Sequence, residues 1–254
     1  MGVRSTQIAF NIGFNIKFNI KFNIAAVQQR IATACERVGR NPDTVTLIAV
    51  SKTQPPELMV AAYQAGIRHF GENYVQEALS KVGRPPLDWQ DVHWHFIGHL
   101  QRNKARDIFP AGNDARFTLI QSVDSVDSLA LAEELDRRAV RSGKKLPVLL
   151  EVKLDPAPAK FGFAPETLLA EVARVQALEG LQLQGLMGMA PFATDPEASR
   201  PFFRQLHGLF IQLGDLVGSQ IQSLSMGMTG DFETAIEEGA THVRIGTAIF
   251  GPRV

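Results

Sequence analysis

Short apolar runs recur along most of the chain and predict β-strands, since they alternate with stretches whose apolar positions follow helical spacing. Eight such runs are present, at residues 44–50, 67–70, 93–97, 118–122, 147–152, 181–187, 223–225 and 241–245. Eight strand–helix units in a chain of 254 residues fit a single (β/α)8 TIM barrel. An open doubly wound sheet is the alternative, and it is less favoured because no Gly-x-Gly-x-x-Gly motif follows the first run.

A four-residue repeat occupies the beginning of the chain. Phe10-Asn11-Ile12 recurs at residues 14–16, 18–20 and 22–24. On a strand the Phe and Ile side chains share one face, whereas on a helix they project to opposite sides, so the tract is interpreted locally as an amphipathic strand. Its regularity favours a low-complexity N-terminal extension over residues 1–23. Helical spacing begins at Ile24, and one barrel domain is expected over residues 24–254.

Composition and charge narrow the classes of function. Apolar residues make up 45% and charged residues 20% of the chain, as in ordinary globular proteins. Lys and Arg (26) balance Asp and Glu (26), so the chain lacks the basic surface expected of a protein that binds nucleic acid or anionic lipid. The single cysteine, Cys35, excludes an internal disulfide framework and a cysteine-based zinc site. No apolar run reaches the length of a membrane span and no secretory signal is found, so we expect a cytoplasmic protein.

Functional residues of such barrels lie at the carboxyl ends of the strands and in the loops that follow. Lys52 ends the first run, in the segment Ala49-Val50-Ser51-Lys52-Thr53. A desolvated lysine at this place can form a Schiff base with an aldehyde. The alternative is a solvated lysine that opens a loop, which is the commoner situation for lysine. Asn73 follows the second run and can either hydrogen-bond a ligand or cap the next helix together with Gln76.

Two histidines at the third run share one face at strand spacing. His93 and His95, together with His242 of the eighth run, could ligate a metal in a hydrolase. No further His, Cys or paired carboxylate at neighbouring strand ends completes the ligand set. Histidines that belong to the core or its surroundings are therefore favoured over a metal site.

The last two runs carry the strongest local signal. Ser225-Met226-Gly227-Met228-Thr229 and Gly246-Thr247 each pair glycine with a hydroxyl residue just before a predicted helix start. Backbone amides and a hydroxyl form an anion cup at such a place, and the loops after strands seven and eight are the usual phosphate site of these barrels. Two glycine turns that only reverse the chain are the alternative. Arg244 lies within an apolar strand and needs a partner, which is either a surface carboxylate or a pyridine nitrogen of a ligand.

Short segments at the predicted strand ends occur in one order along the chain: residues 49–53, 70–77, 94–98, 100–101, 103–104, 122–125, 160–162, 185–187, 224–228 and 243–251. Together they closely resemble the pyridoxal 5'-phosphate (PLP) homeostasis protein family. The resemblance extends from about Ile24 to Pro252 and implies a TIM barrel of the fold-type III PLP enzymes, like the N-terminal domain of alanine racemase.

The resemblance also assigns roles to individual residues. It implies that Lys52 holds PLP as a Schiff base, that Arg244 meets the pyridine nitrogen and that Asn73 lies near the ring. Lys160 matches a second lysine of the family, at which the cofactor could arrive or be handed on. The implied phosphate cup consists of Ser225, Gly227, Thr229, Gly246 and Thr247. Thr229 stands where the family usually has serine, which keeps the hydroxyl, and the Phe-Asn-Ile tract has no counterpart.

The implied arginine constrains the chemistry of the cofactor. Arginine stays cationic and only donates hydrogen bonds, so it leaves the pyridine nitrogen unprotonated and the ring a weak electron sink. Carbanion chemistry is then poor, although a racemase can manage with such a ring. We expect a protein of vitamin B6 homeostasis that binds PLP reversibly and is not an enzyme, with no catalytic residue and no metal. A minimal PLP-dependent amino-acid racemase is the alternative. PLP is the expected small-molecule partner, nucleic acid and membranes are not expected partners, and apo forms of PLP enzymes are candidate recipients.

Overall fold

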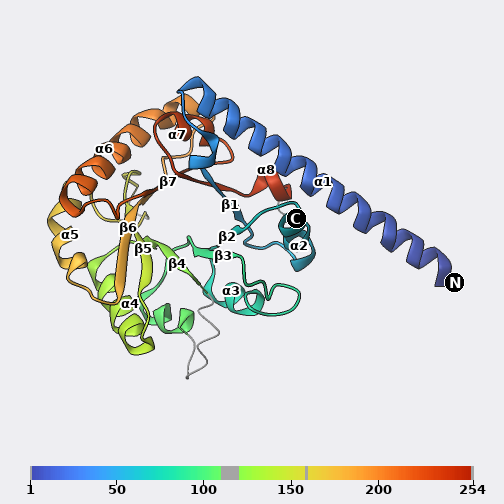
Figure 1. The fold of residues 1–254 in the computed structure, drawn as a ribbon, viewed down its shortest axis with the longest axis horizontal. Helices are drawn as coiled ribbons and strands as arrows, with labels where there is room; N and C mark the ends of the chain where they lie inside the picture. Colours follow the sequence, from blue (N-terminus) through green and yellow to red (C-terminus); the bar gives the residue numbers. More distant parts are fainter. Residues whose placement is uncertain (1, 110–119, 158–159, 253–254) are drawn as a thin grey trace.

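Eight parallel strands form a closed barrel in this computed structural model, which describes residues 2–109, 120–157 and 160–252. Each strand pairs with the next along the chain, and β8 pairs with β1 (Figure 1). The predicted fold class is confirmed. The strands are β1 Thr46–Val50, β2 His69–Glu72, β3 His93–Phe96, β4 Ser122–Val126, β5 Leu146–Val152, β6 Leu181–Gly188, β7 Ser223–Met228 and β8 His242–Ile245. The helices are α1 Gly2–Arg37, α2 Pro56–Gln64, α3 Val75–Lys81, α4 Leu129–Ser142, α5 Leu168–Gln176, α6 Arg200–Val217, α7 Phe232–Glu237 and α8 Thr247–Phe250, with 3-10 turns η1 Pro42–Thr44, η2 Arg102–Ile108 and η3 Pro196–Ser199.

The fourth strand lies further along the chain than the sequence predicts. The apolar pattern places it at residues 118–122, of which 118 and 119 lie outside the described residues, whereas β4 runs from Ser122 to Val126. The polar residues of β4 are buried and hydrogen-bonded to the region of β3: Asp124 Oδ2 lies 2.9 Å from His95 Nδ1, and Ser125 Oγ donates to Gly98 O at 2.6 Å. Because polar side chains fill the barrel here, β4 lacks the apolar run that is typical of a buried parallel strand.

The N-terminal repeat is helical, so its interpretation as an amphipathic strand is wrong. α1 is continuous, and Figure 1 shows it running along one side of the barrel with its amino-terminal part extending beyond it. Ile20 and Ile24 of the repeat are four residues apart and share one helix face, in phase with the apolar positions that follow. Phe22 projects from the other side and is 66% exposed. The buried stripe on the barrel side consists of Ile20, Ile24, Val27 and Ile31.

The proposed boundary between an extension and the barrel, at residues 23 and 24, falls inside α1. Asn23 Nδ2 donates to the carbonyl of Ile249 in α8 at 2.8 Å, so the helix contacts the barrel on both sides of that boundary. The division itself stays a prediction. Neither α1 nor any other helix in the described part of the chain has the apolar length needed to cross a membrane.

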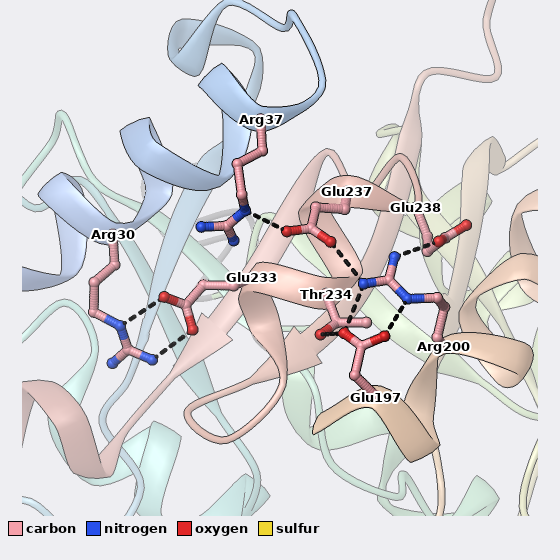
Figure 2. A network of polar contacts seen from close by, with 8 residues as sticks. All are labelled: Arg30, Arg37, Glu197, Arg200, Glu233, Thr234, Glu237 and Glu238. Atoms are coloured by element: carbon pink, nitrogen blue, oxygen red, sulfur yellow. Dashed lines mark hydrogen bonds and ion pairs between the residues drawn. The ribbon is translucent and has the colours of Figure 1, made fainter. Parts of the chain in front are cut away.

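Ion pairs connect α1 to α7, and α7 to the beginning of α6 (Figure 2). Arg30 makes a two-point contact with Glu233 of α7, at 3.1 Å from Nε and 2.9 Å from Nη2. Arg37 donates to Glu237 of the same helix at 2.6 Å, and Glu237 accepts a second bond from Arg200 of α6 at 2.7 Å. Partly exposed ion pairs contribute little individually. The buried isoleucine stripe is therefore expected to supply most of the stability with which α1 packs on the barrel.

Substitutions within the repeat test this packing. Ile24→Ala is expected to lower the free energy of unfolding by about 2–4 kcal/mol, because the side chain is 1% exposed and its removal leaves a cavity. Phe22→Ala is the matched control and should change it by less than about 0.5 kcal/mol, as exposed substitutions do. Urea unfolding followed by circular dichroism measures both. The reverse order of the two effects would show that the phenylalanines, not the isoleucines, face the barrel.

Candidate functional site

The residues predicted for the site come from four consecutive strands of the closed barrel, β7, β8, β1 and β2. Lys52 follows β1 and Asn73 follows β2, while Thr229 and Gly246 follow β7 and β8. The turn after β8 lies beside the end of β1, because a methyl group on Gly246 would be 3.5 Å from the carbonyl oxygen of Val50. All of these positions are at the carboxyl ends of parallel strands, so the barrel brings them to one mouth.

Lys52 lies in a tightly held turn directly after β1. Its side chain is half-buried, between the fully buried Ser51 and the exposed Thr53. The amide of Ser51 donates to Gly71 O at 3.0 Å, which ties the turn to β2. Thr53 has a φ of +62°, a left-handed conformation that β-branched residues rarely adopt. The turn therefore presents Lys52 from a constrained backbone.

Asn73 carries a polar atom without a partner. Its Oδ1 is buried and accepts no hydrogen bond within the described residues. The helix-cap alternative is not supported, because α3 begins after Tyr74 with no side-chain cap. Gly98 packs directly on this segment, since a methyl group there would lie 2.2 Å from Asn73 O. A buried acceptor without a donor is costly, so Asn73 is a point at which a hydrogen-bond donor of a ligand would fit.

Arg244 is 4% exposed and lies inside the barrel. Its Nη1 donates to Ser225 Oγ at 2.7 Å and its Nη2 donates to Gly188 O at 3.0 Å. Burial lowers the pKa of this guanidinium. The interpretation of Arg244 as a surface salt bridge is wrong, because it is buried and no carboxylate in the described residues forms an ion pair with it. Two of its five N–H groups are used by these bonds, which leaves donors for a ligand acceptor.

Two of the residues predicted for the phosphate cup have structural tasks within β7. Ser225 is fully buried and its hydroxyl contacts Arg244, so it lies inside the barrel. Gly227 has a φ of +90°, and a methyl group there would lie 2.6 Å from Ala235 Cβ. Glycine at this position thus lets α7 pack closely on β7. Direct contact of either residue with a phosphate stays a prediction.

The other residues of the predicted cup lie in the turns themselves. Thr229 is half-buried in the turn between β7 and α7. Gly246 is the cap residue of α8, and Thr247 is exposed at its first position. The first amides of a helix lack partners within the helix. These two turns therefore present amides and hydroxyls at the same mouth as Lys52.

Lys160 lies in the loop after β5 and is half exposed, with its Nζ 3.8 Å from Asp155 Oδ2. Residues 158 and 159 of that loop lie outside the described part of the chain. The role of Lys160 as a second lysine for the cofactor stays a prediction.

Four histidines meet at the opposite, amino-terminal end of the barrel. His69, His93 and His242 are the first residues of β2, β3 and β8, and His95 Nε2 lies 3.0 Å from His69 Nδ1. Within the described residues, no group of three or more His, Cys, Asp or Glu has the arrangement of a metal site. The metal interpretation of His93, His95 and His242 therefore gains no support. Asp124 is the polar partner of this cluster, through His95.

Glu151 was not among the predicted site residues. It is 6% exposed near the carboxyl end of β5, and burial together with the charge of Asp127 raises its pKa to about 7. The Arg244 guanidinium acts in the opposite direction. A lone charge in the apolar run 147–152 is the sequence signal that could have identified it.

Partly buried histidines should make stability depend on pH in a defined direction. Burial lowers the pKa values of His69, His93 and His242 to about 4, from an ordinary value of 6.5. Between pH 4 and 6.5 the unfolded chain binds more protons at these histidines than the folded chain does. Their contribution to the free energy of unfolding therefore increases as the pH rises over this range and decreases as the pH falls. His93→Gln should reduce this slope by up to about 1.4 kcal/mol per pH unit, one proton's share.

Glu151 should act with the opposite sign, because its folded pKa of about 7 lies above the ordinary 4.5. The folded chain binds the extra proton between these values, so Glu151→Gln should steepen the rise of stability over pH 4.5–7. Urea unfolding at half-unit pH steps measures both slopes. Identical slopes for the two variants would contradict the assignment of the partly buried neutral histidines.

Comparison with known proteins places the chain in a family. Residues 22–254 match the family described as alanine racemase, N-terminal domain. A pyridoxal phosphate homeostasis protein of Pseudomonas aeruginosa is 42% identical over 230 residues, which cover 91% of this chain and 94% of that protein. PipY of Synechococcus elongatus, solved with PLP bound, is 37% identical with a TM-score of 0.77, covering 91% of this chain and all (100%) of that one.

Alanine racemase of Clostridium difficile shares the fold alone. It has a TM-score of 0.68 at 15% identity, and the match covers 91% of this chain but 56% of the racemase. The family match over nearly the whole chain and the relatives near 40% identity confirm the family that the segments at the strand ends resemble. The chain belongs to the pyridoxal phosphate homeostasis protein family.

Proposed function

We propose that this chain binds PLP reversibly, as a Schiff base on Lys52, and acts in vitamin B6 homeostasis. The observation that supports this most is that Lys52, Asn73, Arg244 and the Gly246–Thr247 turn belong to the carboxyl-terminal parts of strands, or to the turns after them, that are neighbours in the order β8, β1, β2. The PLP-bound structure of PipY, 37% identical, gives independent support.

The residues present fit the chemical groups of PLP. Asn73 Oδ1 is a buried acceptor that lacks a donor, and a ring hydroxyl would supply one. The two glycine–hydroxyl turns after β7 and β8, which hold Thr229, Gly246 and Thr247, suit an anionic phosphate. Ser225 and Gly227 are proposed to complete the cup. The hydroxyl of Ser225 accepts a hydrogen bond from Arg244 and so connects the cup to this arginine.

Lys52 supplies the covalent bond in this proposal. The neutral amine adds to the aldehyde carbon, a C=N bond replaces C=O, and one water molecule leaves with the aldehyde oxygen and both amine protons. No oxidant or reductant is needed, so addition of water reverses the step and releases the aldehyde. A reversible bond of this kind suits a protein that stores the cofactor and gives it up.

Arg244 limits the chemistry of the bound cofactor, which suits a carrier, although a racemase can also manage with such a ring. Its guanidinium is fixed by Ser225 and Gly188 and remains a donor, so the pyridine nitrogen that it meets stays unprotonated. PLP supplies its strongest electron-withdrawing chemistry when that nitrogen carries a proton. We propose that the bound cofactor is held in a weakly reactive form, with apo forms of PLP enzymes as its recipients.

Reductive trapping of the reconstituted full-length protein tests the proposal. Protein incubated with PLP is expected to show absorbance in the Schiff-base band, and borohydride should convert this into a stable adduct. Peptide mapping by mass spectrometry is expected to place the adduct on Lys52. An adduct on Lys160 alone, or no adduct at all, would contradict it.

An amino-acid racemase remains the competing function, because the chain shares its fold with alanine racemases. A chiral assay of the PLP-loaded protein separates the two. Sustained racemisation of an amino acid, lost in Lys52→Ala, would overturn the carrier proposal.

A further inference from the structure

A buried ionic cluster lies directly behind the turn that carries Lys52. It consists of Ser51, Glu72, Glu77 and Lys81, and we call it the Lys81 cluster. Lys81 Nζ donates to Ser51 O at 2.9 Å, to Glu77 Oε1 at 2.5 Å and to Glu72 Oε1 at 3.3 Å. Three contacts use all three N–H groups of the ammonium. One side chain thus connects β1, the end of β2 and helix α3.

The placement of Lys81 inside the protein is unusual for the last residue of a helix. Lysine at a helix C-terminus normally reaches solvent, where it interacts favourably with the helix dipole. Here the side chain is 8% exposed and Glu72 is 0% exposed, and Glu72 Oε2 has no partner in the described residues. Buried ion pairs recover little net stability after desolvation. The contacts of Lys81 are therefore expected to fix the positions of the groups that they join more than to stabilise the fold.

The Lys81 cluster constrains the backbone on both sides of Lys52. Before Lys52, the carbonyl of Ser51 accepts from Lys81, and the hydroxyl of Ser51 donates to Glu72 Oε1 at 2.7 Å. After Lys52, the amide of Thr53 donates to Glu77 Oε1 at 2.5 Å. Thr53 has its left-handed φ of +62° at this point. A conformation that is costly for a β-branched residue persists only where its surroundings hold it.

We propose that Lys81 is a positioning residue that directs Lys52 toward the aldehyde of the cofactor. Lys81 bonds to the residue before Lys52 and, through Glu77, to the residue after it, so it fixes the direction in which the Lys52 side chain leaves the backbone. The ammonium of Lys81 is engaged by Ser51, Glu72 and Glu77, so Lys81 has no part in the covalent step. The inference rests on the proposed function and adds to it the reason why this turn is rigid.

Two ligands separate positioning from folding. PLP can bond to Lys52, whereas pyridoxine 5'-phosphate has the same ring and phosphate but an alcohol in place of the aldehyde, so it reports the non-covalent part alone. Lys81→Met removes the three donors and keeps an unbranched apolar stem. We expect its affinity for PLP to fall at least about tenfold, because misplacement of a reacting group by about 1 Å has effects of this size. Affinity for pyridoxine 5'-phosphate should stay within about twofold.

Control variants complete the experiment. Lys145→Met, at an exposed position before β5, should leave both affinities unchanged. Glu77→Gln keeps an acceptor for Thr53 but loses the charge beside Lys81, and it should reduce affinity for PLP selectively, by less than Lys81→Met. It also serves as the test if circular dichroism shows that Lys81→Met does not fold.

The outcomes distinguish this inference from the proposed function. Equal losses for the two ligands, or no loss for either, in a folded variant would overturn the positioning role. Wild-type protein that binds PLP no better than pyridoxine 5'-phosphate, with no trapped adduct on Lys52, would instead overturn the proposed function itself.

Discussion

Lys52→Ala protein is expected to hold no borohydride-stable PLP and to show no Schiff-base absorbance. The ring and phosphate contacts remain in this variant, so its affinity for PLP should fall to the level measured for pyridoxine 5'-phosphate. At a PLP concentration 100 times the wild-type Kd, binding should stabilise the wild-type fold by about 2.7 kcal/mol. For a domain of this size that corresponds to roughly 5–10 °C in Tm. Most of this increase should be absent in Lys52→Ala.

Two controls make the Lys52 result interpretable. The Tm of Lys52→Ala without PLP should lie close to that of the wild type, because Lys52 is only half-buried. Lys160→Ala, at a half-exposed lysine, should keep the adduct on Lys52. A trapped adduct in Lys52→Ala would show that another lysine holds the cofactor.

Gly98→Ala is expected to destabilise the fold and to weaken cofactor binding together. A methyl group on Gly98 would lie 2.2 Å from Asn73 O and 2.7 Å from Asn73 Cα, and neither backbone atom can rotate away as a side chain could. The segment after β2 must shift, at a cost of about 3 kcal/mol that is typical of overpacking. Since Asn73 lies in the shifted segment, affinity for pyridoxine 5'-phosphate should fall as well.

Gly208→Ala is the matched control for this substitution. Gly208 lies on an exposed face of α6, and a methyl group there meets nothing within 4 Å. Because alanine is the better helix former, this variant should be more stable than the wild type by about 0.5–1 kcal/mol. Thermal unfolding and ligand titration measure both variants. A Gly98→Ala protein with wild-type stability would mean that the β2 and β3 ends are further apart than described.

Periodicity predicted the barrel because it depends on local order, and seven of the eight predicted runs overlap a strand in the structure by two or more residues. The exception, β4, overlaps only at Ser122, since three of its five buried residues are polar, and Ser122 and Asp124 find a partner in His95 on β3. The prediction of a strand for the N-terminal repeat was wrong for another reason. Its pattern is compatible with both periods, and only the phase of Ile24 with Val27 and Ile31 distinguishes a helix from a strand.

The residues of the candidate site that lie at or near strand ends could be predicted from the sequence. Lys52 stands out as a charge just after an apolar run and Arg244 as a charge within one, and the barrel fold brings the carboxyl ends of both strands to one mouth. The Lys81 cluster could not be predicted in this way. Lys81 lies in a polar helix, and its contact with Ser51 joins residues 30 positions apart, which only the folded chain reveals.

Closure of the barrel has a consequence for when the protein becomes competent. Ile48 of β1 pairs with Arg244 of β8, so the candidate site spans the junction at which the first and the last strand close the barrel. During synthesis Lys52 leaves the ribosome early, whereas Arg244 and the turn after β8 leave it only when almost the whole barrel has been made. Nascent chains and chains shortened at the C-terminus should therefore not bind PLP. A ligand that contacts both β1 and β8 would stabilise the pairing of these two strands against opening of the barrel.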